Sequence, residues 1–140
     1  MAAADLEPYP CGPTPDGYDT EYWEGLRSGR LVLPRCDDCG QWRALGRSMC
    51  SGCWSTAIRW DQVAPSGTVF TWIRTHRDFV SELDLPAPYV TVLVELHEAP
   101  VRLLGILTAG GDSVSIGAPV AGTFSQPDNA AWPVLRWEAT

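Results

Sequence analysis

The chain is short and acidic: its 140 residues carry 10 basic and 17 acidic side chains, a formal net charge of −7 at pH 7. This length fits one domain, or one domain with a small appendage, and 45% hydrophobic residues can supply a core. The negative charge disfavours nucleic-acid binding, and because every basic residue is arginine, Schiff-base chemistry on a lysine is excluded.

No stretch of the chain approaches the roughly 18 apolar residues of a membrane-spanning helix. The first residues, M-A-A-A-D-L-E-P, have neither a basic start nor an apolar segment, so they predict no export signal. We therefore expect a cytoplasmic protein.

Residues 1–18 are rich in proline, glycine and aspartate and are expected to form an extended arm. Cys11 lies in this arm and is interpreted as a plain free thiol. A short helix should follow, with Asp19 or Thr20 as its cap and Gly29 at its end.

The predicted helix carries one apolar stripe, made of Tyr22, Trp23 and Leu26. So short a helix is not stable alone, which means that the stripe must pack against something. Two interpretations stay open: the stripe docks onto the core of this chain, or it docks onto a partner protein.

The next stretch holds two Cys-x-x-Cys pairs separated by ten residues: Cys36 and Cys39, then Cys50 and Cys53. Two such knuckles place four sulfurs at the corners of a tetrahedron, which suits Zn²⁺ with Zn–S distances of about 2.3 Å. Gly40 and Gly52 supply backbone freedom for the knuckles. With four thiolates the site is closed, so the predicted zinc is structural.

Three other uses of these cysteines are conceivable. A redox Cys-x-x-Cys normally stands alone at a helix N-terminus, and disulfides need an oxidising compartment, so both are disfavoured. A single iron held by four thiolates has the same geometry and stays open.

The hairpin between the knuckles carries Trp42, Arg43, Leu45 and Arg47, which we expect to be exposed on a small rigid platform. A scaffold role is favoured over a ligand site. Short strands should flank the ribbon, one at residues 31–34 and one at residues 58–60.

The remainder of the chain predicts a mainly β domain. Val, Ile, Thr and aromatic runs with turn residues between them indicate five strands, as in a small Greek-key barrel of the OB type. These strands are expected at residues 66–77, 89–96, 101–108, 119–125 and 133–138.

The sequence contains no recognisable catalytic constellation. His76 and His97 fall at strand ends, where a structural role is favoured over a general base. Arg74 and Arg77, together with Arg47 and Arg102, are candidates to converge on an anionic ligand. The chain therefore points to a binding or assembly role.

Three motifs together resemble the domain-of-unknown-function family thirty-five: W-E-G-L-R-S-G-R-L-V-L-P-R-C-D-D-C-G with its second cysteine pair, S-G-T-V-F-T-W, and P-Y-V-T-V-L-V-E-L. The resemblance covers about residues 18–137. It implies an N-terminal arm and helix at residues 1–34, a rubredoxin-like zinc ribbon at 35–60 and a C-terminal OB-fold domain at 61–140.

The resemblance further implies an accessory subunit of thiolase-superfamily enzymes that act on acyl-CoA. Relatives bridge thiolase and synthase, serve acyltransferases, or pair with thiolase-like aldolases that shorten steroid side chains. The preferred hypothesis is a retro-aldolase, or carbon–carbon lyase, in which the catalytic residues lie on a thiolase-like partner, itself a dimer, and acyl-CoA is the ligand or substrate of the complex.

The four ribbon cysteines carry over directly as zinc ligands. The family's Pro-Pro-Arg turn is replaced here by Ala44-Leu45-Gly46-Arg47, which keeps the arginine and loses the prolines. The candidate contacts to acyl-CoA or to the partner are Arg47, Trp42, Arg74, Arg77, Tyr22 and Trp23.

Two alternatives remain beside this hypothesis. The chain could bind acyl-CoA by itself, or serve a thiolase or an acyltransferase instead of an aldolase. By fold analogy alone, an OB-fold barrel could also bind single-stranded nucleic acid.

Overall fold

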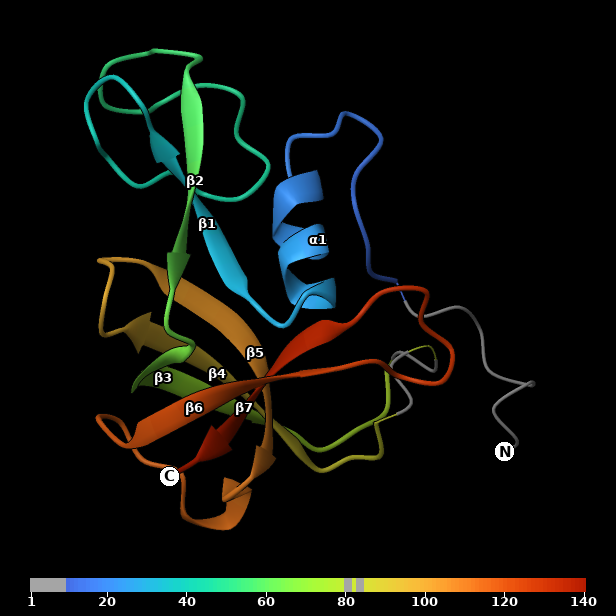
Figure 1. Cartoon of the computed structure of the whole chain (residues 1–140). Helices are drawn as coiled ribbons and strands as arrows, with labels where there is room; N and C mark the ends of the chain where they lie inside the picture. Colours follow the sequence, from blue (N-terminus) through green and yellow to red (C-terminus); the bar gives the residue numbers. More distant parts are fainter. Residues whose placement is uncertain (1–9, 80–81, 83–84) are drawn as a thin grey trace.

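The computed structural model describes residues 10–79, 82 and 85–140. It has three parts: a helix, a two-stranded ribbon and a closed five-stranded barrel (Figure 1). The ribbon rises from one end of the barrel, and the helix lies beside it. The mainly β architecture predicted from the sequence is confirmed. The elements are α1 (Thr20–Arg27), β1 (Leu31–Cys36), β2 (Ile58–Val63), β3 (Ser66–Thr75), β4 (Tyr89–Leu96), β5 (Arg102–Ala109), η3 (Gly111–Ser113), β6 (Pro119–Ser125) and β7 (Val134–Ala139).

Helix α1 ends as predicted, at a glycine. Gly29 has φ of +74°, and its N–H donates to the carbonyl of Leu26 at 3.1 Å. The N–H of Arg30 donates to the carbonyl of Gly25 at 2.8 Å. This pair of bonds is a Schellman motif, and it satisfies the last carbonyls of the helix.

The start of α1 differs from the expectation. Asp19 occupies the N-cap position, but its carboxylate makes no hydrogen bond to the helix backbone. It accepts instead from the backbone N–H of Thr14 at 2.8 Å and from Nε1 of Trp23 at 3.1 Å. The Asp19 carboxylate therefore connects the preceding arm to the helix. The preference for aspartate at helix N-caps does not predict this role.

The apolar stripe of α1 packs on this chain. Tyr22 and Leu26 are buried in one cluster with Leu31 and Leu33 of β1, and Trp23 is half-buried at its edge. The docking of the helix onto its own core, one of the two open interpretations, is therefore what the structure shows for Tyr22 and Leu26.

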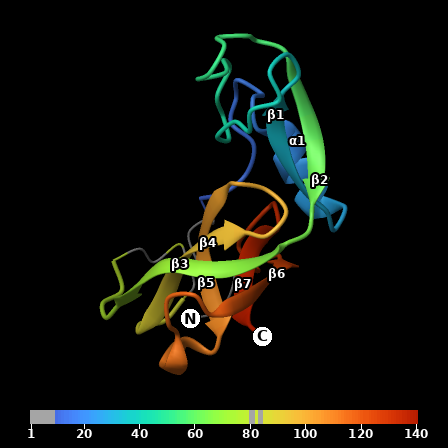
Figure 2. The ribbon, with the colours of Figure 1, turned by 90° about the vertical axis from the view of Figure 1, so that its left-hand side faces the viewer.

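The ribbon is an antiparallel pair in which β1 residues 31–36 face β2 residues 63–58 in continuous register. At the outer end of the ladder Cys36 faces Ile58, and at the inner end Leu31 faces Val63. Strand β2 leads through two residues into β3, the first strand of the barrel (Figure 2). The ladder is thus a stiff arm between the cysteines and the barrel.

The barrel closes in the order β3-β4-β5-β7-β6. Only β5 and β7 run parallel; the other neighbouring strands are antiparallel. Its interior is filled by side chains that include Val69, Val92, Val94 and the fully buried Trp137. All five predicted strands are confirmed, although β3 ends at Thr75 rather than Arg77.

Among the described residues, no helix has the length and the apolar character that crossing a membrane requires.

We predict that Gly25→Ala loosens the helix from the ribbon. A Cβ at this position would lie 2.8 Å from Cγ2 of Val32 and 2.9 Å from the carbonyl oxygen of Arg30. Overpacking of this kind costs about 1–3 kcal/mol, although alanine is otherwise the better helix former by about 1 kcal/mol. Urea unfolding should show a lower free energy of unfolding, and the exposed Glu21→Ala should change it little. A more stable Gly25→Ala protein would mean that α1 is not pressed against β1.

Candidate metal centre and ligand-contact residues

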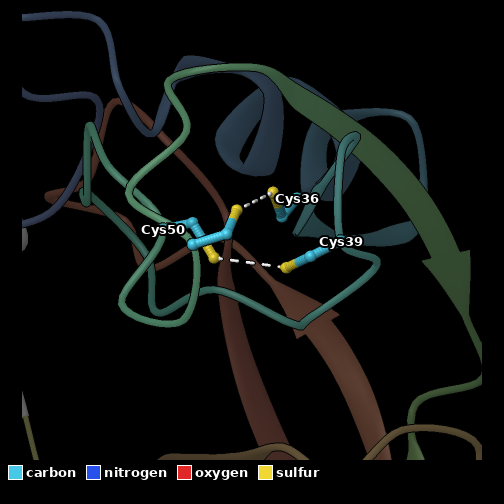
Figure 3. Close-up of side chains that lie close together, drawn as sticks. Cys36, Cys39 and Cys50 are labelled. Atoms are coloured by element: carbon cyan, nitrogen blue, oxygen red, sulfur yellow. Dashed lines mark hydrogen bonds between the residues drawn. The ribbon is translucent and has the colours of Figure 1, made fainter.

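The four ribbon cysteines meet at the outer end of the β1–β2 ladder. Their sulfurs all lie within 4.8 Å of one another. Sγ of Cys36 is 3.6 Å from Sγ of Cys53, and Sγ of Cys39 is 3.6 Å from Sγ of Cys50 (Figure 3). Four sulfurs around one zinc at about 2.3 Å would be about 3.8 Å apart, so the cluster has the dimensions of a tetrahedral site.

The two knuckles have the same backbone construction. The N–H of Gly40 donates to the carbonyl of Cys36 at 3.0 Å, and the N–H of Trp54 donates to the carbonyl of Cys50 at 3.0 Å. Each donor follows the second cysteine of its pair, and each has positive φ, +77° at Gly40 and +65° at Trp54. Each knuckle is therefore a tight turn that brings its two sulfurs to one side.

Backbone N–H groups point at the sulfurs of the first cysteine in each pair. The N–H of Cys39 makes the largest contribution to lowering the pKa of Cys36 to about 6, and the N–H of Asp38 adds to it. The N–H groups of Cys53 and Gly52 likewise lower the pKa of Cys50. Such donors stabilise thiolates, which are the form that binds a metal.

Cys53 behaves in the opposite way. The N–H of Ser55 lowers its pKa, but Cys36, burial and the other two sulfurs outweigh this and raise it to about 12. One thiolate thus makes the next one costly when no cation is present. A divalent ion removes that repulsion, so the donor set fits a cation and releases protons on binding it.

The cluster fits a closed structural zinc site held by Cys36, Cys39, Cys50 and Cys53. All five cysteines are free thiols, so the disulfide alternative has no support. Zinc and a single iron share this geometry. Cys11 stays outside the cluster; it is half-buried, and its Sγ donates to the carbonyl of Trp132 at 3.6 Å.

The platform between the knuckles is less exposed than predicted. Arg43 is only 6% exposed, and its Nη2 donates to the carbonyls of Ser55 at 3.2 Å and Ala57 at 3.0 Å. Trp42 and Leu45 are half-buried and pack against the core. The expectation that all four residues are exposed was wrong for these three, because the hairpin folds back over the exit of the second knuckle and over the barrel.

Arg47 is exposed, as predicted. It lines a groove of about 490 Å³ with Met49 and Trp54 on the outer side of the ribbon. Trp42 lines a second groove, of about 420 Å³, between the ribbon and strands β4 and β5. The two residues therefore face different hollows.

The arginines proposed to share one anion are not brought together. Arg74 donates to the carbonyl of Gly111 at 2.5 Å, at the end of the barrel away from the ribbon that carries Arg47 (Figure 1). Arg102 pairs with Glu95 at 3.0 Å and stacks on Phe70. Arg77 is exposed beyond the end of β3. The sequence could not reveal this separation because it depends on the path of the barrel strands.

The two histidines have no arrangement typical of a catalytic base. Nδ1 of His97 lies 3.0 Å from Oγ of Ser66, and the N–H of His97 donates to the carbonyl of Ser66 at 3.0 Å. These bonds join the end of β4 to the start of β3. His76 is exposed just after β3.

Sequence reasoning did not anticipate the roles of Arg43 and Trp54. Nothing in the sequence marks Arg43 as buried. The equivalence of Trp54 and Gly40 could have been seen by aligning the two knuckles. The first reads C-D-D-C-G and the second C-S-G-C-W, so tryptophan stands where the first knuckle has glycine.

Comparison with known proteins identifies relatives of both the ribbon and the barrel. Residues 23–59 match the family model of the ChsH2 rubredoxin-like zinc ribbon domain, and residues 60–125 match that of the ChsH2 C-terminal OB-fold domain. A protein of Thermomonospora curvata named "Probable enoyl-CoA hydratase alpha subunit" is 31% identical over 122 residues. That alignment covers 84% of this chain but only 37% of the relative, so the chain spans about a third of the relative's length.

Among the solved structures that share the fold are these two. One is a chain of the "Ltp2-ChsH2(DUF35) aldolase", with a TM-score of 0.79 and 26% identity, covering 91% of this chain and 98% of that one. The other is a DUF35 protein of unknown function from Sulfolobus solfataricus, with a TM-score of 0.60 and 20% identity, covering 91% and 87%.

Replacing a ribbon cysteine should remove the metal. We expect Cys39→Ser and Cys50→Ser to lose stoichiometric zinc and to unfold at a clearly lower temperature, because metal binding supplies folding free energy to such ribbons. Elemental analysis and thermal unfolding measure both effects. Cys11→Ser is the matched control and should retain one zinc. Full metal content in the Cys50 variant would refute the four-cysteine site.

The buried guanidinium of Arg43 should matter for stability, and Arg47 should not. Arg43→Met removes two hydrogen bonds from a charged donor and should lower the free energy of unfolding by about 2 kcal/mol. Arg47→Met changes an exposed side chain and should shift it by less than about 0.5 kcal/mol. Chemical denaturation in the presence of zinc compares the two variants. Equal effects would mean that Arg43 does not hold the ribbon.

Proposed function

Because the chain belongs to the DUF35 family of ChsH2, we propose that it is a non-catalytic subunit of a thiolase-superfamily complex that acts on acyl-CoA. The preferred reaction is a retro-aldol cleavage in the degradation of steroid or similar side chains. In this proposal a thiolase-like partner supplies the catalytic residues, and this chain supplies a zinc-stabilised platform.

The observation that carries the proposal is the likeness to the chain of the Ltp2-ChsH2(DUF35) aldolase. It extends over 91% of this chain and 98% of that one. The helix, ribbon and barrel therefore correspond together to one whole chain of an assembly, and not to one shared domain. A name that joins Ltp2 and ChsH2 supports a second subunit as the partner.

The chemistry of the described residues agrees with a supporting role. His97 is engaged with Ser66, and Arg74 with the backbone of Gly111. The cysteines that could act as nucleophiles are gathered in the metal cluster, apart from Cys11. A reaction on acyl-CoA would thus need groups from a partner, and Arg47, Arg77 and Trp42 are the candidates to contact acyl-CoA or that partner from this side.

A second candidate function rests on the Thermomonospora relative, whose name refers to an enoyl-CoA hydratase subunit. Because this chain matches about a third of that protein, it could serve a hydratase as a separate subunit. Both candidates place the chain next to a CoA thioester.

Co-purification tests the proposal. A thiolase-like protein from the same genome should co-purify with this chain when the two are expressed together. The complex should cleave a β-hydroxyacyl-CoA whose β-carbon carries two carbon substituents, giving a shorter acyl-CoA and a ketone. The partner alone should be insoluble or inactive. Cys50→Ser, which should lose the platform, is the matched control. A partner that is fully active and soluble alone would contradict the proposal.

Calorimetry separates the proposal from a self-sufficient acyl-CoA carrier. Titration of the isolated chain with acyl-CoA should give no heat at micromolar ligand if the binding site is completed by the partner. Saturable binding by the isolated chain would favour the carrier.

A further inference from the structure

The second knuckle carries a tryptophan at a position that the first knuckle fills with glycine. Gly40 and Trp54 each follow the second cysteine of a pair, and each donates its N–H at 3.0 Å to the carbonyl of the first. Both are left-handed, with φ of +77° and +65°. Within the described residues, Trp54 is the one non-glycine residue with positive φ.

A tryptophan at this left-handed position is unfavourable for the isolated chain in two ways. A bulky side chain disfavours left-handed backbone, which glycine adopts without a steric cost. The indole also gains little packing in return, because Trp54 remains 76% exposed, the second most exposed of the large hydrophobic side chains in the described regions. Non-glycine residues held in left-handed backbone cluster at functional sites.

Trp54 does not stand alone on this surface. It lines the 490 Å³ groove with Met49, which is 48% exposed, and with the exposed Arg47. The residues that line the groove include no carboxylate, although the chain as a whole has a net charge of −7. Arg47 makes no ion pair with any residue that the structure describes.

We propose that Arg47, Met49 and Trp54 form the docking point for the thiolase-like partner. This inference rests on the proposed function and adds to it the surface that the partner covers. Tryptophan, arginine and methionine are enriched at protein interfaces, and tryptophan and arginine dominate their binding energy. The complementary partner surface is an apolar hollow that accepts the indole of Trp54, with carboxylates at its edge facing Arg47.

The second cysteine knuckle sets the geometry of this docking point. Met49 immediately precedes Cys50, and Trp54 immediately follows Cys53. Both apolar groups are therefore held by one knuckle, and a metal that fixes the knuckle also fixes their spacing. Rigid anchors of this kind lose little conformational entropy on binding.

Trp54→Gly is the decisive variant, because it should have opposite effects on folding and on docking. Glycine relieves the left-handed strain, so the zinc content should be unchanged and the unfolding temperature equal or higher. The Kd for the zinc-loaded chain and the thiolase-like partner, measured by calorimetry, should rise at least tenfold. Ile116→Ala is the matched control: Ile116 is 71% exposed and lies in the β5–β6 connection, away from the ribbon. It should bind the partner as the unmodified chain does.

A charge variant tests the second half of the docking point. Arg47→Gln should weaken binding at low salt and reduce the salt dependence of the Kd, because it removes the attraction to partner carboxylates. An unchanged Kd in Trp54→Gly would overturn the inference while leaving the proposed function intact. An equal loss in Ile116→Ala would also overturn it. If the unmodified chain does not bind the partner at all, both proposals fail.

Discussion

The pairing of β1 with β2 is the interaction on which the whole arrangement depends. Its outer end fixes Cys36 against Ile58, and its inner end fixes Leu31 against Val63 inside the core cluster. One short ladder thus connects the sulfur cluster to the barrel. Helix α1 packs on the same β1, and Arg27 of the helix stacks 3.6 Å from the ring centre of Trp132 in the β6–β7 connection. The ribbon is therefore braced on the barrel from two sides.

The two ends of this ladder are stabilised in different ways. The barrel has a packed interior, centred on Trp137, that hydrophobic burial can maintain. The knuckles have few buried apolar groups, and a tetrathiolate zinc site can supply about 10–16 kcal/mol. That is comparable to the whole stability of a typical domain, about 5–15 kcal/mol. A metal bound there would therefore stabilise the outer part of the molecule, and Arg43 adds hydrogen bonds to the knuckle exit that a metal alone does not provide.

The sequence predicted those features that depend on local pattern. The cysteine spacing predicted the sulfur cluster, and Gly29 predicted the end of α1. Runs of β-branched residues predicted the five barrel strands. Features that depend on how segments meet in space were not predictable. Arg43 has no apolar signature, and its burial follows from carbonyls of Ser55 and Ala57 more than ten residues away. Likewise, Arg47 and Arg74 were only candidates to converge on one anion, and the structure keeps them apart because the closed barrel separates the ribbon from its far end.

That separation bears on the proposed recognition of an anionic thioester. Arg74 is engaged by the backbone of Gly111, and Arg102 by Glu95 and Phe70, so two of the candidate cations are already bonded within the chain. Arg47 lies at the other end of the molecule, on a surface dominated by Met49 and Trp54. No described groove gathers several of the candidate cations, as a site for a polyanion such as CoA would need. In the proposed complex, most of the charge of CoA would therefore be met by the partner. The proposed contribution of this chain is then a rigid surface, and the β1–β2 ladder sets the position of that surface relative to the barrel.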